Sequence, residues 1–249
     1  MLMQPLYDKL KLLRLPGVKE ALQEQMQTPK YAELNFEERF GLLIDHEMTL
    51  REDRRLERRL RDARFRERSA CLADLDISAA RGLDRKLILS LSHGDWIHQH
   101  LNILITGATG VGKTYLGCVL GRCACEQGFS VFYGKSSRIL VDLESSHGDG
   151  TWSKMLNSLA KTRVLILDAW FREPLSPEQI HSLLEIFDDR WQKGSTILIS
   201  QLPVQEWHSH FSEPTLADAI LDRILHNSYK IEMLGESLRK LNFKKKEKI

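Results

Sequence analysis

The sequence lacks any apolar run near the roughly 20 residues that a membrane-spanning helix needs. Its first residues, MLMQPLYDKLKLLRL, are interrupted by lysines and an aspartate, so they lack the apolar core of a signal peptide. The net charge is only +2, so any surface for nucleic acid must come from local clustering of basic residues. These absences predict a cytoplasmic protein that does not enter a membrane.

The sequence also lacks cysteines or histidines at the spacings typical of metal sites. The four cysteines are Cys71, Cys118, Cys123 and Cys125, and they show no CxxC spacing. The last three fall in one predicted helix. They are predicted to be free and buried in a reducing compartment, and a zinc site is the alternative. The nine histidines include WHSH at 207–210 but no HExxH pair, which favours structural or surface roles.

The residues that are present divide the chain into four regions. Residues 1–70 have helical periodicity and predict a small all-helical domain that binds a partner protein or DNA. Residues 71–100 mix short helical pieces with glycines and predict a connector, whereas 101–243 alternate strands with helices. Residues 244–249, KKKEKI, form a basic tail.

One helical stretch of the first region, 36–68, is rich in arginine. Nine arginines are mixed with acids in its second half, at positions 51, 54, 55, 58, 59, 61, 64, 66 and 68. A solvated helix supported by i,i+4 ion pairs explains this pattern. Contacts with phosphates explain it as well, because arginine without lysine suits that chemistry. The sequence leaves both interpretations open.

Four short apolar segments predict β-strands. They are LNILIT (101–106), SVFYG (130–134), RVLILD (163–168) and STILIS (195–200), and helical patterns such as 177–194 separate them. Gly194 is the expected end of that helix, and the last thirty or so residues are expected to return to helix. Near-continuous apolar strands separated by helices predict an α/β fold with a parallel sheet covered by helices on both faces.

The strongest motif follows the first of these strands. It fits G-x-x-x-x-G-K-[ST] through Gly107, Ala108, Thr109, Gly110, Val111, Gly112, Lys113 and Thr114. The glycines let backbone N–H groups turn toward phosphates, and the following helix adds positive potential at its N-terminus. Lys113 is expected to reach the β- and γ-phosphates, and the Thr114 hydroxyl to bind Mg²⁺. The sequence therefore predicts a site for ATP or GTP.

The third strand ends on Asp168, which is expected to complete the magnesium side of the site. ATPases of the AAA+ type place a second acid directly after this aspartate to polarise the attacking water. Ala169 occupies that position here, and the next acid, Glu173, lies five residues beyond Asp168. The expected protein binds ATP but hydrolyses it slowly or not at all, unless the loop folds Glu173 back to serve.

Between about residues 36 and 240 the chain resembles the IstB family of insertion-sequence transposition helper ATPases, AAA+ relatives of the DnaC helicase loader. The matching stretches include ERFGLLIDHE, RGLD, GATGVGKTYLGCVLGRCACEQG, SQLPVQEWH and ADAILDRILHNSYKIEMLGESLRK. Similar sequences read more like LILDDWG at the third strand, so Ala169 and Phe171 depart from the pattern. The resemblance implies a P-loop AAA+ module preceded by the helical domain.

The resemblance also implies roles for other residues. Gln201, after the fourth strand, corresponds to a polar residue that senses the γ-phosphate. Arg223 resembles an arginine finger that reaches the nucleotide of a neighbouring subunit, and Arg239 resembles a second phosphate sensor. The segment 135–160 falls where related proteins carry a helix that faces DNA. The expected phosphate contacts in this segment and directly after it are Lys135, Arg138, Lys154 and Lys161.

Together these features predict an ATP- and Mg²⁺-dependent regulator of DNA transposition. It is expected to form a homo-oligomer on duplex DNA, largely independent of DNA sequence, and to recruit or stimulate a transposase. One alternative is a loader of a replicative helicase, which shares the module but engages a helicase. The other is a non-hydrolysing DNA scaffold gated by nucleotide, which the missing acid favours.

Overall fold

The computed structural model describes residues 3–148, 150–171 and 174–238, and the chain divides into two compact units, Met1–Arg58 and Arg59–Ile249. The first unit is helical and consists of α1 (Met3–Leu12), α2 (Pro16–Gln27), the 3-10 helix η1 (Pro29–Glu33) and most of α3 (Phe36–Asp62). This confirms the predicted helical N-terminal region. No helix in the described ranges is long and apolar enough to cross a membrane.

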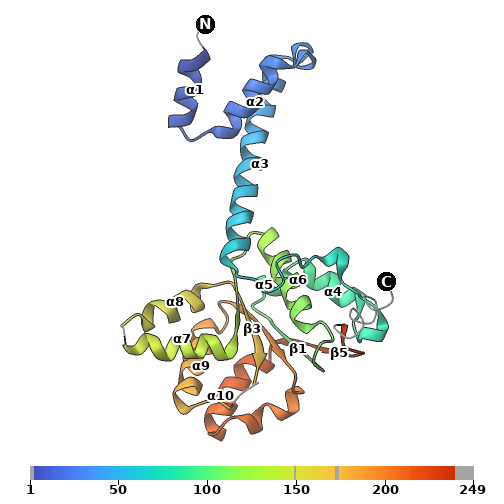
Figure 1. The fold of residues 1–249 in the computed structure, drawn as a ribbon, viewed down its shortest axis with the longest axis vertical. Coiled ribbons are helices and arrows are strands. Elements are labelled where there is room, and N and C mark those ends of the chain that lie inside the picture. The colour runs from blue at the N-terminus through green and yellow to red at the C-terminus, as the bar shows by residue number, and fades with distance from the viewer. Residues whose placement is uncertain (1–2, 149, 172–173, 239–249) are drawn as a thin grey trace, which may run out of the picture. The chain divides into compact units, whose positions relative to one another are not determined.

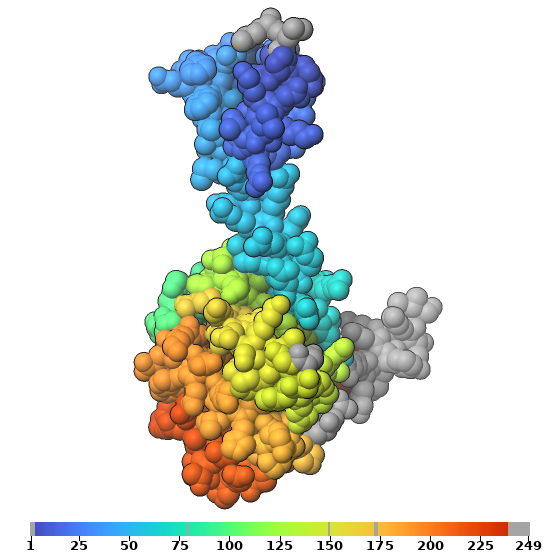
Figure 2. All heavy atoms as spheres, turned by 90° about the vertical axis from the view of Figure 1, so that its left-hand side faces the viewer, coloured from blue at the N-terminus to red at the C-terminus, as the bar shows by residue number. Residues whose placement is uncertain are grey.

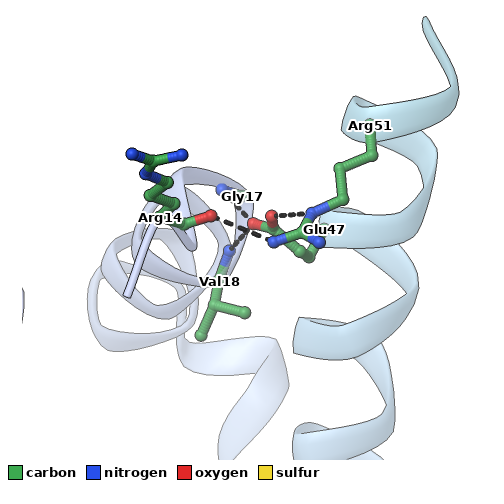
Figure 3. A network of polar contacts seen from close by, with 5 residues as sticks. All are labelled: Arg14, Gly17, Val18, Glu47 and Arg51. Carbon is green, nitrogen blue, oxygen red and sulfur yellow. Dashed lines mark hydrogen bonds and ion pairs between the residues drawn. The ribbon is translucent and has the colours of Figure 1, made fainter. Parts of the chain in front are cut away.

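The first unit has a small core and a buried carboxylate. Its buried apolar side chains are Leu10, Val18, Ala21 and Leu43. Glu47 of α3, only 5% exposed, accepts hydrogen bonds from the N–H groups of Gly17 (2.7 Å) and Val18 (3.2 Å) (Figure 3). These N–H groups open α2, whose N-cap side chain makes no capping bond. Glu47 therefore caps α2 from another helix.

The second unit contains a five-stranded sheet of order β2-β3-β4-β1-β5, in which every neighbouring pair is parallel (Figure 1). Its elements in chain order are η2 (Leu72–Asp74), η3 (Ala79–Arg81), α4 (Arg85–Ser92), α5 (Asp95–His98), β1 (Asn102–Gly107), α6 (Lys113–Glu126), β2 (Val131–Lys135), α7 (Ser136–Gly148), α8 (Trp152–Lys161), β3 (Val164–Trp170), α9 (Pro177–Arg190), β4 (Ser195–Ser200), η4 (Val204–Glu206), η5 (His208–His210), α10 (Pro214–Leu225) and β5 (Ser228–Met233). The predicted α/β fold with a parallel sheet is confirmed.

On the central strands, leucine side chains lie on one face of the sheet and isoleucine side chains on the other. Leu104, Leu165 and Leu198 belong to one buried cluster with α7–α10, whose side of the molecule faces the viewer in Figure 2. The other face meets α6 so closely that a Cβ on Gly117 would lie 2.5 Å from Ile199 Cδ1. Helices therefore cover both faces, as continuous apolar strands require.

The expectation of helix for the last thirty or so residues is wrong between Ser228 and Met233, which form β5. This strand pairs with β1 at the edge of the sheet. Ile231 and Met233 are buried, whereas Lys230 and Glu232, which alternate with them, are exposed. An edge strand with one polar face has alternating rather than continuous apolar residues, so it does not match the pattern of the central strands.

The segment predicted as a connector, residues 71–100, packs into the second unit. Ile88, Trp96 and Ile97 are almost completely buried, and the indole N–H of Trp96 donates to the carbonyl of Leu91 (2.9 Å). A buried segment with its polar groups satisfied is part of a core rather than a loose link. The domain boundaries expected from the sequence stay predictions.

Candidate nucleotide-binding site

The glycine-rich loop lies at the carboxyl edge of the sheet, between the end of β1 and the start of α6 (Figure 1). Gly107, Gly110 and Gly112 have φ angles of 135°, 87° and 110°. A Cβ on Gly107 would lie 2.1 Å from the Met233 carbonyl oxygen, and one on Gly110 would lie 2.2 Å from Ser237 Oγ. Both backbone conformation and space therefore require glycine, as in a loop that cradles phosphates.

Lys113 is the first residue of α6 and is 7% exposed. Its Nζ donates to the carbonyls of Gly107 (2.6 Å) and Ala108 (2.8 Å), which holds the ammonium against the loop. Thr109 lies at the tip of the loop, and Val111 is buried. A phosphate entering this loop would meet the Lys113 charge and the positive end of α6 together.

The structure brings the two predicted magnesium-side residues together. The Thr114 hydroxyl donates to Oδ2 of Asp168 at 2.9 Å, although the residues lie on α6 and β3. Asp168 is 5% exposed, and its Oδ1 accepts a bond from the N–H of Ala169 (2.8 Å). A hydroxyl and a carboxylate are hard oxygen ligands that suit Mg²⁺, which completes its octahedron with phosphate oxygens and water.

Sequence reasoning missed Tyr133, which also contacts Asp168. Its hydroxyl donates to Asp168 Oδ2 at 2.6 Å from the adjacent strand β2. Burial and this hydrogen bond raise the pKa of Tyr133 well above its usual value, so the phenol is a neutral donor. The signal was a tyrosine hydroxyl in the predicted strand SVFYG, two residues before β2 ends at Lys135.

Ala169 has a left-handed backbone with φ of 60°, next to a register shift between β3 and β4. Its carbonyl accepts a hydrogen bond from Ser136 Oγ at 3.1 Å. Aspartate and asparagine occupy the left-handed region more readily than alanine, so the backbone suits the acid that the sequence lacks. Glu173, the alternative base, lies outside the described residues.

Of the two other predicted phosphate sensors, Gln201 and Arg239, the structure describes only Gln201. Gln201 is exposed directly after β4, which lies between β3 and β1, so it shares the edge of the sheet with Asp168 and the loop. The preceding Ser200 is buried, and its hydroxyl donates to the carbonyl of Trp170 (3.0 Å). Arg239 lies outside the described residues.

Arg223 lies at the opposite edge of the sheet. Its side chain pairs with Asp188 and donates to the carbonyl of Ala219 (2.7 Å), while its own carbonyl accepts from Asn102 Nδ2 (3.3 Å). Asn102 opens β1 and the phosphate loop follows the end of β1, about 20 Å away for a strand of this length. Arg223 is therefore far from the loop of its own subunit.

The segment after β5 closes over the phosphate loop. The N–H of Leu238 donates to the Gly110 carbonyl at 2.9 Å, and the N–H of Leu234 donates to the Arg81 carbonyl at 2.9 Å. Arg81, 8% exposed, donates through Nη1 to the Glu236 carbonyl at 2.7 Å. The stretch RGLD matched the family but suggested no role for Arg81; here Arg81 fastens the segment after β5 to its own segment.

The four predicted DNA-contacting cations do not gather in one place. Lys135 ends β2 in register with Asp168, at the carboxyl edge of the sheet. Lys161 ends α8 shortly before β3 begins, at the amino edge. Arg138 on α7 and Lys154 on α8 are both exposed. Their contacts with DNA stay a prediction, and they form no single patch.

The cysteines are free within the described chain, and three of them are buried. Burial raises the pKa of Cys118 and Cys123 to about 11 and that of Cys125 to about 12, so these thiols stay protonated. No cluster of three or more His, Cys, Asp or Glu residues suited to a metal occurs in the described ranges. These observations favour free structural cysteines over a zinc site.

The sequence is similar to those of known ATP-binding proteins. The family described as IstB-like ATP binding protein matches residues 8–247. An insertion-sequence ATP-binding protein of Sinorhizobium fredii is 43% identical over 240 residues, which cover 96% of this chain and 98% of the relative. The ATP-binding protein of insertion sequence IS1162 from Pseudomonas fluorescens is 48% identical over 203 residues, covering 82% and 88%.

Solved structures share the fold at low identity. DnaI has a TM-score of 0.58 and 22% identity, covering 66% of this chain and 91% of DnaI. DnaA of Aquifex aeolicus bound to AMPPCP has a TM-score of 0.57 and 17% identity, covering 72% and 55%. They support a P-loop AAA+ fold for the second unit. With the family match over nearly the whole chain, the chain belongs to the IstB-like ATP-binding proteins of insertion sequences.

Proposed function

We propose that this chain is an ATP-binding helper of DNA transposition that assembles in its ATP form on duplex DNA and recruits or stimulates a transposase. The contact between Thr114 and Asp168 beside the glycine loop carries the nucleotide part of the proposal. The transposition part is supported by relatives that are named as ATP-binding proteins of insertion sequences.

Different residues of the site bind the phosphates and the Mg²⁺ ion. The loop and Lys113 hold the β- and γ-phosphates, and Gln201 orients a phosphate oxygen or a water from the end of β4. Thr114 and Asp168 would hold Mg²⁺, which offsets phosphate charge when bound. Tyr133 and the Ala169 N–H fix the Asp168 carboxylate, so this group is positioned before nucleotide arrives.

Turnover is the step that Ala169 weakens. Hydrolysis of ATP to ADP and phosphate requires a group that orients water and takes its proton, and such a group contributes about 100- to 10,000-fold. The Ala169 methyl group can do neither. The ATP form of the assembly is therefore long-lived.

The position of Arg223 supports the proposed oligomerisation. Because it lies at the amino edge of the sheet, it contributes to phosphate binding only when it is presented to a second copy of the chain. Its pairing with Asp188 and Ala219 positions it for that role. Each nucleotide site is then complete only in the assembly.

The test is steady-state ATP hydrolysis with duplex DNA for the native chain, Ala169→Asp and Ala169→Asn. Asp and Asn both tolerate the left-handed backbone, but only Asp can accept a proton. We expect all three to bind a fluorescent ATP analogue and only the Asp variant to turn over, by about 100-fold or more above the native chain. Lys113→Ala serves as the control that does not bind.

Rapid hydrolysis by the native chain would contradict the role given to Ala169. Glu173, or a residue of a neighbouring copy, would then be the candidate base. Equal turnover by the Asp and Asn variants would show that backbone relief, rather than proton transfer, limits the reaction.

Two other functions have specific support. Similarity in fold to the DnaC helicase loader favours a helicase loader, and Ala169 favours a scaffold in which ATP only holds the assembly together. Finding a transposase reading frame beside the gene would support the transposition helper over the loader. Nucleotide-dependent oligomers of the Ala169→Asp variant that fail to dissociate on turnover would support the scaffold.

A further inference from the structure

A basic cleft of about 520 Å³ lies on the second unit beside α6. We name it the arginine cleft, and its lining residues are Leu60, Arg61, Arg64, Phe65, Glu67, Arg68, Ala70 and Arg122. The lining residues thus carry four guanidinium groups and one carboxylate. The cleft carries a concentrated positive charge although the chain as a whole is nearly neutral.

The arginine cleft is separate from the nucleotide site. Arg122 lies near the end of α6, whereas Lys113 begins the same helix at the phosphate loop. Nine residues of helix place their backbones about 13 Å apart along the helix axis. The cleft therefore cannot be a second part of the phosphate loop.

The segment that carries three of the arginines is fixed to the sheet and to α6. The Ala63 carbonyl accepts a hydrogen bond from the N–H of Tyr133 on β2 (2.8 Å), and Arg59 Nε donates to the Cys125 carbonyl (2.8 Å). Phe65 is buried so close to α6 that a Cβ on Gly121 would lie 2.6 Å from its ring. A ligand would meet a preformed surface, which lowers the cost of binding.

The guanidinium groups are available to a ligand. Arg64 is exposed, has a left-handed φ of 56° and lies over the Phe132 ring at 5.7 Å. Arg68 is exposed and makes no hydrogen bond or ion pair within the described part of the chain. Arg61 and Arg122 make only surface ion pairs with neighbours on their own segments, and such pairs contribute little.

The chemistry of the arginine cleft matches a chain of phosphates. Guanidinium groups bind phosphate oxygens through paired N–H donors, and several in one cleft can contact successive phosphates of a polymer. The lining offers no exposed aromatic ring on which an unpaired base could stack, because Phe65 is buried. This combination favours the backbone of a duplex over a single strand.

We propose that the arginine cleft binds the phosphate backbone of duplex DNA. This rests on the proposed function and deepens it, because it assigns DNA contact to a cleft separate from the scattered cations of segment 135–160. The contact is independent of DNA sequence and sensitive to salt.

The test measures binding of a fluorescent duplex of about 30 base pairs to the full chain by anisotropy, with a non-hydrolysable ATP analogue and Mg²⁺. The variant is Arg64→Gln/Arg68→Gln, and the charge-matched control is Arg85→Gln/Lys86→Gln on exposed positions of α4. At about 0.1 M salt we expect the cleft variant to bind roughly tenfold more weakly. Its slope of log K against log salt should fall by about 1.8, or about 0.9 per lost contact. The control should keep the native affinity and slope.

Several outcomes overturn the assignment without touching the proposed function. They are unchanged affinity and slope in the cleft variant, an equal loss in the control, or tighter binding of a single strand than of the duplex. Failure of the native chain to bind duplex DNA in any nucleotide state would overturn the proposed function as well. Unchanged binding of the ATP analogue by the variant shows that the second unit is folded.

Discussion

The two units bury charge in different ways. The first unit has four buried apolar side chains and a buried carboxylate, Glu47. Arg51 Nε donates to Glu47 at 2.6 Å, and two N–H groups at the start of α2 donate to it as well (Figure 3). The second unit has a large apolar core and a buried guanidinium, Arg190, which is 2% exposed and lacks a carboxylate partner among the described residues. Each charge satisfies backbone groups at the end of a helix.

The stability of the first unit depends more on its buried charge than the stability of the second unit does. Arg190 joins the end of α8 to the starts of β3 and β4, and its acceptors are Leu159, Thr162, Arg163, Ser195 and Thr196. The layers of the sheet hold these elements together as well. Glu47 connects α2 and α3 in a unit with little apolar area, so its contacts make up a larger share of that unit's stability.

The largest effect is expected for Arg190→Leu. The change leaves several buried carbonyls without a donor, which lowers the free energy of unfolding of the second unit by about 3 kcal/mol. Thermal unfolding monitored by a bound ATP analogue measures it. The matched change Arg163→Leu removes one bond, from Nη1 to the Lys193 carbonyl (2.8 Å), and should cost far less. Equal stability of the two variants would contradict the role of Arg190.

Glu47→Gln should weaken the first unit by about 2 kcal/mol and leave nucleotide affinity unchanged. The amide keeps one oxygen for α2 but loses the charge that Arg51 and the start of α2 share. Faster hydrogen exchange of residues 16–27 reports the loss, with exposed Glu52→Gln as the control. Unaltered exchange in the Glu47→Gln variant would mean that the apolar contacts alone hold α2 in place.

Tyr133→Phe separates ligand binding from stability in the second unit. Without its hydroxyl the Asp168 carboxylate is less firmly oriented, and Mg²⁺-dependent affinity for an ATP analogue should fall about tenfold, as for other groups that support a metal ligand. The control is Tyr229→Phe on β5. The defect should vanish when Mg²⁺ is chelated; a loss of the same size without Mg²⁺ would point to a general structural role instead.

The smallest expected effect is the acid sensitivity of the first unit. Burial acts to raise the pKa of Glu47, but hydrogen bonds from Arg51, Val18 and Gly17 outweigh it and hold the pKa below its usual value of 4.5. A lowered pKa stabilises the folded unit above the usual value, and this stability is lost as pH falls through the folded pKa. The amide NMR shifts of Gly17 and Val18 should follow that titration in the native chain and not in Glu47→Gln.

Sequence patterns anticipated the first four strands and the helix after the phosphate loop because each is a local signal. The central strands are continuous apolar runs, and the glycine spacing of the loop is dictated by backbone conformation. They failed for β5, where Lys230 and Glu232 interrupt the apolar residues of an edge strand. They also placed the end of α9 at Gly194, whereas the helix ends at Arg190, before a left-handed Gln192.

Local sequence patterns were enough to predict the parallel α/β class, the glycine loop with Lys113 and Thr114, the aspartate near the end of β3 and the absence of an acid after it. They could not predict that Tyr133 contacts Asp168, that Arg81 anchors the segment over the loop, or that Arg122 joins the arginines of 61–68 in one cleft. The reason is physical. Periodicity and backbone conformation are properties of neighbours along the chain, whereas these contacts join residues that only the packing of helices against the sheet brings together.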